Sequence, residues 1–188
     1  MLQINKRGII RFILAIAVAS IIFTFNTMIV NAKDYSVESA EFDIAIGHTG
    51  VAKITETWTL DFNGSYSRFY KEFNFKNISE LEETEVILLD LKINGKTVTE
   101  ADSYDRVDYT YSIDTTSLGK QINLYYNVKD DKVVYEITYE LLDAVKKVNK
   151  DGVDEALFCY RLIGDNFEKK IDKVVINIET VGNKDELE

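Results

Sequence analysis

The sequence predicts an all-β protein, an antiparallel β-sandwich of immunoglobulin-like architecture, preceded by an N-terminal signal or anchor helix. Apolar and polar residues alternate with a period of two along many short stretches, which is the pattern of half-buried strands. Turn residues separate these stretches at the spacing of an all-β sandwich. After the leader, the chain keeps about 150 residues, enough for one domain to bury a core without disulfide bonds.

The first 32 residues have the three parts of a secretory signal peptide. Their only charges are basic, an apolar run over 12–25 follows, and the small-residue sequence 30–32 resembles an export cleavage site. We therefore predict cleavage after Ala32. The alternative is an uncleaved anchor, because the stretch 12–30 is just long enough to span a bilayer. The basic residues precede the apolar run, so the body faces outward in either case.

The mature chain opens with a predicted β-hairpin. Apolar residues alternate over 40–46 and again over 51–62, and Gly47–Gly50 forms the turn between them. In the second stretch, Trp58 faces the core, and Glu56 is assigned to the polar face.

The next stretch, 66–75, is dense in aromatic residues. Its alternation places Phe69 and Phe73 on the core face and turns Tyr66 and Tyr70 toward solvent. Exposed tyrosines beside acidic residues can recognise a peptide or a sugar, so Tyr66 and Tyr70 are candidate binding residues. Packing into the core is the alternative use of these rings.

Further strands and one helical turn complete the predicted domain. Asn94-Gly95 is a strong hairpin signal, and residues 144–150 are expected to form an irregular helical turn. The domain is expected to span 33–182, followed by an acidic tail over 183–188. The remaining predicted strands are 86–93, 96–98, 109–111, 122–126, 133–142, 156–163 and 171–178.

Charge and cysteine content exclude some classes of protein. The formal net charge is −10, and residues 1–32 carry only positive charges, so the mature chain is more acidic still. This argues against nucleic acid as a partner, since nucleic-acid binding needs a basic surface. The single cysteine, Cys159, lies between apolar and aromatic residues, which predicts a buried, inert thiol.

No pattern in the sequence predicts a catalytic centre or a cofactor. The one histidine, His48, has no nucleophile or second ligand beside it. Asn149, Asp151, Asp154 and Glu155 offer hard oxygen ligands in one loop, which makes them weak calcium candidates. Their spacing does not match an EF-hand, and ordinary turn chemistry is the alternative.

Two stretches resemble the N-terminal domain of the DUF2207 family of predicted bacterial membrane proteins. The family's V-T-E…F-x-G…Y-R pattern is matched within 35–75 by Ile54-Thr55-Glu56, Phe62-Asn63-Gly64 and Phe69-Tyr70-Lys71. Its later pattern, D-x-x-E-L-Y-W-x-x-I-G…W, is matched by DEALFCYRLIGDNFEKKIDKVVINI at 154–178.

Four substitutions depart from the family pattern. Lys71 replaces an arginine, Cys159 a tyrosine, and Tyr160 and Phe167 replace tryptophans. The resemblance implies an extracytoplasmic β-sandwich behind a leader, with no settled activity and no catalytic residues to carry over. The family usually continues into transmembrane helices, whereas nothing after Ile178 here can span a membrane, which leaves a free secreted domain or a fragment as alternatives.

The expected function is that of an exported, non-catalytic binding domain without a cofactor. Its partner would be a protein or a polysaccharide of the cell envelope, and it would meet the membrane only through an uncleaved leader or missing C-terminal segments. A structural piece of a larger membrane protein is one alternative. A carboxylate-dependent envelope hydrolase is another, since paired carboxylates can cleave glycosidic bonds.

Overall fold

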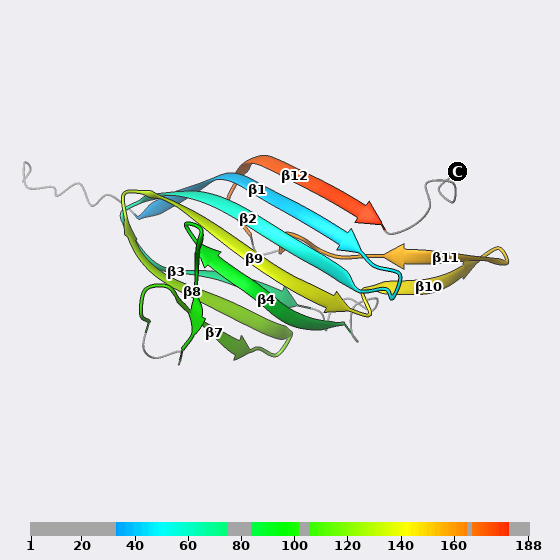
Figure 1. The fold of residues 1–188 in the computed structure, drawn as a ribbon. Helices are drawn as coiled ribbons and strands as arrows, with labels where there is room; N and C mark the ends of the chain where they lie inside the picture. The colour runs from blue at the N-terminus through cyan, green and yellow to red at the C-terminus, as the bar shows by residue number, and fades with distance from the viewer. Residues whose placement is uncertain (1–32, 75–83, 102–105, 165–166, 181–188) are drawn as a thin grey trace, which may run out of the picture. The chain divides into compact units, whose positions relative to one another are not determined.

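The computed structural model describes residues 33–74, 84–101, 106–164 and 167–180 (Figure 1). Every regular element in these ranges is a β-strand, which confirms the predicted all-β class. None of the described residues forms a helix long and apolar enough to cross a bilayer. The predicted leader, its cleavage site at Ala32 and the acidic tail lie outside the described residues.

The first sheet has six strands and holds both ends of the described chain. The first and last strands, β1 and β12, are paired in parallel, whereas every other pair in this sheet is antiparallel. The predicted antiparallel arrangement is therefore corrected at this pair of strands. In spatial order the strands are β12 (Ile171–Thr180), β1 (Asp34–Ile46), β2 (Ala52–Asn63), β9 (Lys132–Leu142), β4 (Glu85–Ile93) and β5 (Lys96–Thr97).

The second sheet has four strands and packs against the first. In spatial order these are β3 (Ser65–Asn74), β8 (Gly119–Lys129), β7 (Thr110–Thr115) and β6 (Thr99–Glu100). The rings of Phe69 and Tyr135 stack across the layers at 4.5 Å, and Phe73 meets Tyr139 edge-on at 4.9 Å. The two sheets thus face each other over one shared core, seen as two layers of ribbon in Figure 1.

Alternation along β2 and β9 builds the centre of this core. In both strands every second side chain is buried, because successive residues point to opposite faces of a sheet. The predicted hairpin of β1 and β2 is confirmed. In its turn, Gly50 adopts a φ of 79° and its N–H donates to the Gly47 carbonyl at 3.1 Å. The largest fully buried side chains are Tyr135, Tyr139, Phe42, Phe73, Ile54, Leu60, Ile93, Ile122, Leu124, Ile137 and Leu141.

A separate hairpin, β10 (Val145–Lys150) with β11 (Val153–Phe158), replaces two predicted elements. The predicted helical turn at 144–150 is a strand, and the predicted buried strand at 156–163 ends at Phe158 with an exposed face. The cause is the two-residue turn Asp151-Gly152, whose φ angles of 54° and 86° suit a tight hairpin.

The end of β11 and the segment after it fold back onto the core. Phe158, Tyr160, Leu162 and Phe167 are partly buried against it. The alternation that turns Phe158 and Tyr160 inward turns the residue between them outward, so Cys159 is exposed. The prediction of a buried thiol was therefore wrong.

Candidate functional site

The most unusual feature of the core is a fully buried carboxylate, Glu56 on β2. Trp58 Nε1 donates a hydrogen bond to Glu56 Oε2 at 2.8 Å, and the Tyr139 hydroxyl donates to Oε1 at 2.5 Å. Lys71 Nζ, from β3 in the facing sheet, lies 2.9 Å from the same Oε1 and completes an ion pair. These partners offset the large free-energy cost of burying a charge.

The sequence assignment of Glu56 to the polar face was wrong. Residues two apart on a strand share a face, so Glu56 points the same way as Ile54 and Trp58, which are both buried. The same parity turns Lys71 inward with Phe73. A charged residue in step with buried apolar neighbours on each of two strands was the signal that could have revealed this pair.

The buried pair also holds the segment that follows β11. Lys71 Nζ donates to the Leu162 carbonyl oxygen at 2.7 Å, and the hydroxyls of Tyr139 and Tyr160 lie 3.0 Å apart. Because the single hydroxyl proton of Tyr139 goes to Glu56, Tyr160 is the donor in the second bond. The network therefore joins both sheets and the segment over 160–162.

Burial dominates the acid–base behaviour of the two tyrosines in this network. It raises the pKa of Tyr139 well above its ordinary value, and the nearby Glu56 carboxylate raises it further. Burial, followed by the charge of Glu56, likewise raises the pKa of Tyr160. Both rings are consequently neutral donors at ordinary pH.

Positions that carry the family resemblance meet in this network although they lie far apart in the sequence. Glu56, Lys71 and Tyr160 are members, and the Phe167 ring packs on Trp58 at 5.5 Å. Glycoside hydrolysis needs two carboxylates that flank an accessible bond, whereas the charged group facing Glu56 is a lysine and the pair is buried. The network therefore has a structural role, because it joins the two sheets to the segment over 160–162.

The two candidate tyrosines lie in different environments. A β-bulge between Tyr66 and Arg68 shifts the alternation of β3, so Tyr66 is partly buried against the ring of Phe62 at 4.7 Å. The expectation that it faces solvent was wrong. Tyr70 is 51% exposed, and the Arg68 guanidinium lies 5.6 Å from the centre of its ring.

The calcium candidates are distributed over the β10–β11 hairpin. Asn149 Nδ2 donates to Asp154 Oδ1 at 2.8 Å, and Lys147 Nζ lies 2.6 Å from Asp154 Oδ2. Asn149 Oδ1 accepts the N–H of Gly152, as in an ordinary turn. Within the described ranges, no group of three or more His, Cys, Asp or Glu side chains could hold a metal ion, so the geometry gives the calcium prediction no support.

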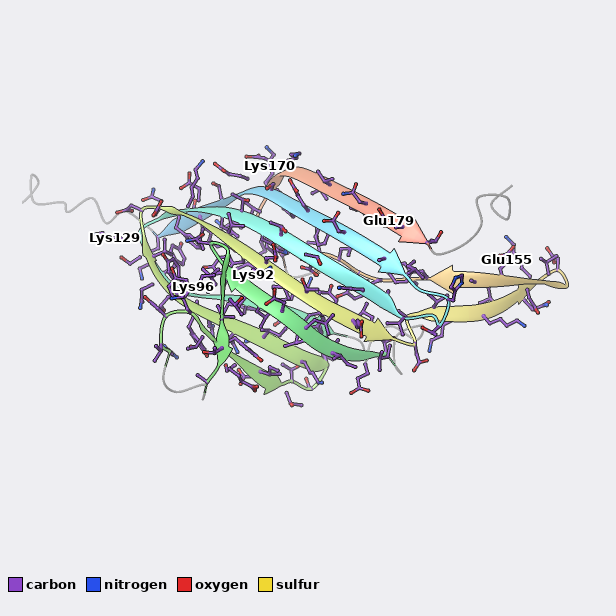
Figure 2. The ribbon with its side chains drawn as sticks, viewed as in Figure 1. Lys92, Lys96, Lys129, Glu155, Lys170 and Glu179 are labelled. Carbon is purple, nitrogen blue, oxygen red and sulfur yellow. The ribbon has the colours of Figure 1, made fainter. Side chains whose placement is uncertain are left out.

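A shallow hollow lies between this hairpin and the turn that joins β1 to β2. Its volume is about 710 Å³, and His48, Val145, Glu155 and Phe158 are among its lining residues. Figure 2 shows Glu155 on the projecting hairpin. The lining combines apolar and charged groups without a convergent set of polar atoms, so it does not point to one ligand chemistry.

The edge strand β12 presents an apolar stripe to solvent. Val174, Ile176 and Ile178 pair with Ala40, Phe42 and Ile44 of β1, so they lie on the core-facing side of the first sheet. They are nevertheless 45%, 50% and 56% exposed. In the described part of the chain, no strand pairs with the outer edge of β12.

Sequence reasoning placed a strand here but missed this surface. The run Val174–Ile178 has apolar residues on both faces of the strand, which normally marks a strand buried on both sides. On an edge strand the same run leaves an uncovered surface. This pattern was the available signal, but it becomes informative only when the strand is known to lie at the edge.

Comparison with solved structures gives loose matches to a leukotriene A4 hydrolase and to a zinc metallopeptidase. Leukotriene A4 hydrolase from Saccharomyces cerevisiae matches with a TM-score of 0.43 and 12% identity, over 62% of this chain and 17% of that one. The M1 zinc metallopeptidase from Deinococcus radiodurans matches with a TM-score of 0.36 and 11% identity, over 56% of this chain and 20% of that one. This chain thus spans a fifth or less of either protein, and similarity at this level assigns it no activity.

Sequence comparison is more specific. No curated protein sequence matches the chain. The family model described as "Predicted membrane protein (DUF2207) N-terminal domain" matches residues 36–188, which confirms the resemblance in the two motif stretches. The chain therefore belongs to the DUF2207 family of predicted membrane proteins, as its N-terminal domain.

Proposed function

We propose that this chain is a non-catalytic, extracytoplasmic interaction domain that binds a polypeptide partner through the edge of β12. The exposed apolar stripe Val174, Ile176 and Ile178, beside an unpaired strand edge among the described residues, is the observation that carries the proposal. A strand edge offers main-chain hydrogen bonds to an added strand, and alternate side chains supply the contact area. Exposed apolar surface of this kind marks interaction sites.

A protein partner suits the surface better than a polysaccharide. Sugar recognition of the kind expected for Tyr66 and Tyr70 needs several exposed aromatic rings, and Tyr66 is partly buried against the core. Tyr70 is the one aromatic side chain among the described large hydrophobic residues that are strongly exposed. The β12 stripe is aliphatic, and aliphatic side chains pack against other side chains.

Two other features belong to the same proposal. The signal-like pattern of residues 1–32 supports export, with cleavage after Ala32 or retention as an anchor. Family membership favours a second candidate role, an extracytoplasmic structural piece of a larger membrane protein. The immunoglobulin-like detail of the sandwich stays a prediction, as does the weak calcium candidate site. No contact geometry of Glu56 favours the hydrolase alternative.

The exposed thiol of Cys159 allows a direct test of location. It is the only cysteine in the chain, so a membrane-impermeant maleimide added to intact cells reports on one site. We expect labelling of the cell-associated protein without lysis, and none in a Cys159→Ser control. Labelling that requires lysis would contradict an extracytoplasmic position.

A photocrosslinking amino acid at position 176 tests the binding surface in the native host. We expect a discrete polypeptide adduct with the probe at 176. The matched control carries the probe at Leu89, which is apolar and 47% exposed but lies at a bulge of β4. If the two positions gave the same adducts, or neither gave any, the proposed binding function would be wrong.

A further inference from the structure

We propose that the occupant of the β12 edge is a second copy of this chain, whose β12 pairs antiparallel with the first about a twofold axis at Ile176. The proposal rests on the binding function proposed above and names its partner. Cyclic dimers are the commonest assemblies, and their interface requires one surface to complement itself. The sequence of β12 meets that requirement on both faces.

On the core-facing side, the pairing is apolar over 174–178, and Asp172 lies opposite Thr180 of the second copy at either end. A twofold axis at Ile176 places Ile176 opposite Ile176 of the second copy, and Val174 opposite the second copy's Ile178. Side chains that are directly opposite in an antiparallel pair lie about 4.5–5.5 Å apart at Cβ, close enough for contact. Three exposed aliphatic residues from each copy thereby gain apolar neighbours.

On the outer side, the same register matches opposite charges. It places Lys173 opposite the second copy's Glu179, and this pair occurs twice because of the symmetry. Lys173 also lies 3.4 Å from Glu41 of its own chain while its side chain stays 65% exposed, so its charge would stand between two carboxylates. Figure 2 shows Glu179 near the C-terminal end of β12.

The other edges of the two sheets carry features that oppose strand addition. At the far side of the first sheet, β4 has a bulge between Leu88 and Asp90, and β5 has two residues. In the second sheet, β6 has two residues, and β3 carries a bulge and two exposed charged side chains, Arg68 and Glu72. Short strands, bulges and charges are the ordinary means of blocking edge-to-edge pairing. By contrast, β12 has ten residues with an uncharged centre over 174–178.

Engineered disulfides test the register directly. In the full-length Cys159→Ser chain, Ile176→Cys places two thiols opposite each other at the axis, and the Cα spacing of either antiparallel pair type permits a disulfide. We expect a disulfide-linked dimer at least tenfold more abundant than with the Leu89→Cys control. Differently tagged Val174→Cys and Ile178→Cys chains should cross-link to each other more than either does to itself.

Charge exchange supplies an independent readout. Glu179→Lys would place a lysine opposite Lys173 of the second copy at both symmetric positions of the dimer. We expect about tenfold weaker association, measured by sedimentation of the full chain. The charge-reversed variant Glu41→Lys with Lys173→Glu and Glu179→Lys restores opposite charges at both contacts of position 173 and should recover the original affinity. Circular dichroism and the midpoint of thermal unfolding confirm that each variant folds.

The outcomes separate this inference from the function on which it rests. Equal disulfide formation at positions 176 and 89, or no recovery in the charge-reversed variant, overturns the dimer. If the probe at 176 then yields an adduct with a different polypeptide of constant mass, the edge is a binding surface for another protein. An absence of adducts at 176 overturns both proposals.

Discussion

The buried ion pair of Glu56 and Lys71 stabilises the fold, and removal of either charge alone costs free energy because the other charge stays buried without a partner. Glu56→Gln leaves the Lys71 ammonium buried without its counter-ion, and we expect it to lower the free energy of unfolding by about 3–5 kcal/mol. Lys71→Met likewise leaves the Glu56 carboxylate buried without its counter-ion. The double variant should lose less than the sum of the two, because neither charge is then left alone.

Urea unfolding of the four proteins at neutral pH measures this coupling. The matched control is Glu136→Gln, which removes the partly exposed ion pair between Glu136 and Lys92 on the first sheet. We expect a much smaller loss there, since exposed pairs contribute little. Additive effects of Glu56→Gln and Lys71→Met would show that the two charges do not depend on each other.

Residue positions were predictable from the sequence where the alternation was regular. Trp58 and Phe73 lie in the core as predicted, but Glu56 was assigned to the wrong face because its charge was given more weight than its parity. Tyr66 was misplaced because one bulge reverses the alternation beyond it. Bulges depend on the partner strand, so a single stretch of sequence does not reveal them.

Among the structural elements, the hairpin of β4 and β5 depends on its two turn residues. Asn94 and Gly95 have φ angles of 51° and 75°, the left-handed conformation that glycine adopts without strain. Gly95→Ala should lower the free energy of unfolding by about 1 kcal/mol, although the added methyl would contact nothing within 4 Å. The cause is therefore backbone conformation rather than crowding.

Gly164→Ala is the appropriate control for that substitution. A methyl group at position 164 also meets nothing within 4 Å, but the residue does not adopt a positive φ. We expect a change within about 0.5 kcal/mol in the same denaturation assay. Equal losses at positions 95 and 164 would rule out the conformational explanation.

Elements with explicit turn signals were predicted well. The Asn94-Gly95 and Gly47–Gly50 turns are confirmed, and β12 begins at the predicted residue. The β10–β11 hairpin was missed because β10 has only two apolar residues and β11 is largely exposed although four of its six residues are apolar, so periodicity alone favoured other structures. The Asp151-Gly152 dipeptide was a valid signal that carried too little weight.

For the whole molecule, we expect stability to fall in alkaline solution. Burial raises the pKa of Tyr135, Tyr139 and Tyr160, so the folded state keeps protons that the unfolded chain releases above about pH 10. This contribution to stability is complete below that pH. As the pH rises further, it falls by up to about 1.4 kcal/mol per pH unit for each tyrosine, until the folded protein also loses the proton.

Urea unfolding between pH 8 and pH 11 measures that slope. Tyr135→Phe should reduce it, because phenylalanine does not titrate, and the exposed Tyr70→Phe should leave it unchanged. Paired surface lysines titrate in the same range, so the comparison between the variants isolates the tyrosine contribution. A slope that is equal in all three proteins would show that the buried ring does not control alkaline stability.

At this scale, the class of fold was predictable but the order of the strands was not. Alternation showed that most strands have one buried face, and this leads to stacked sheets. Pairing between strands as far apart as β1 and β12 leaves no local trace in the sequence. The parallel pair and the position of β12 at an edge, on which the proposed binding surface depends, consequently became visible only in three dimensions.

The parallel pairing of β1 with β12 also determines how the domain would respond to mechanical tension. Asp34 begins one strand and Thr180 ends the other, so a pull on these two residues is directed along the strands in opposite senses. The nine paired positions from Val37–Ile171 to Ile46–Thr180 would then be strained together in shear, instead of opening one after another like a zipper. A domain held at these two points would resist extension until the whole ladder yields at once.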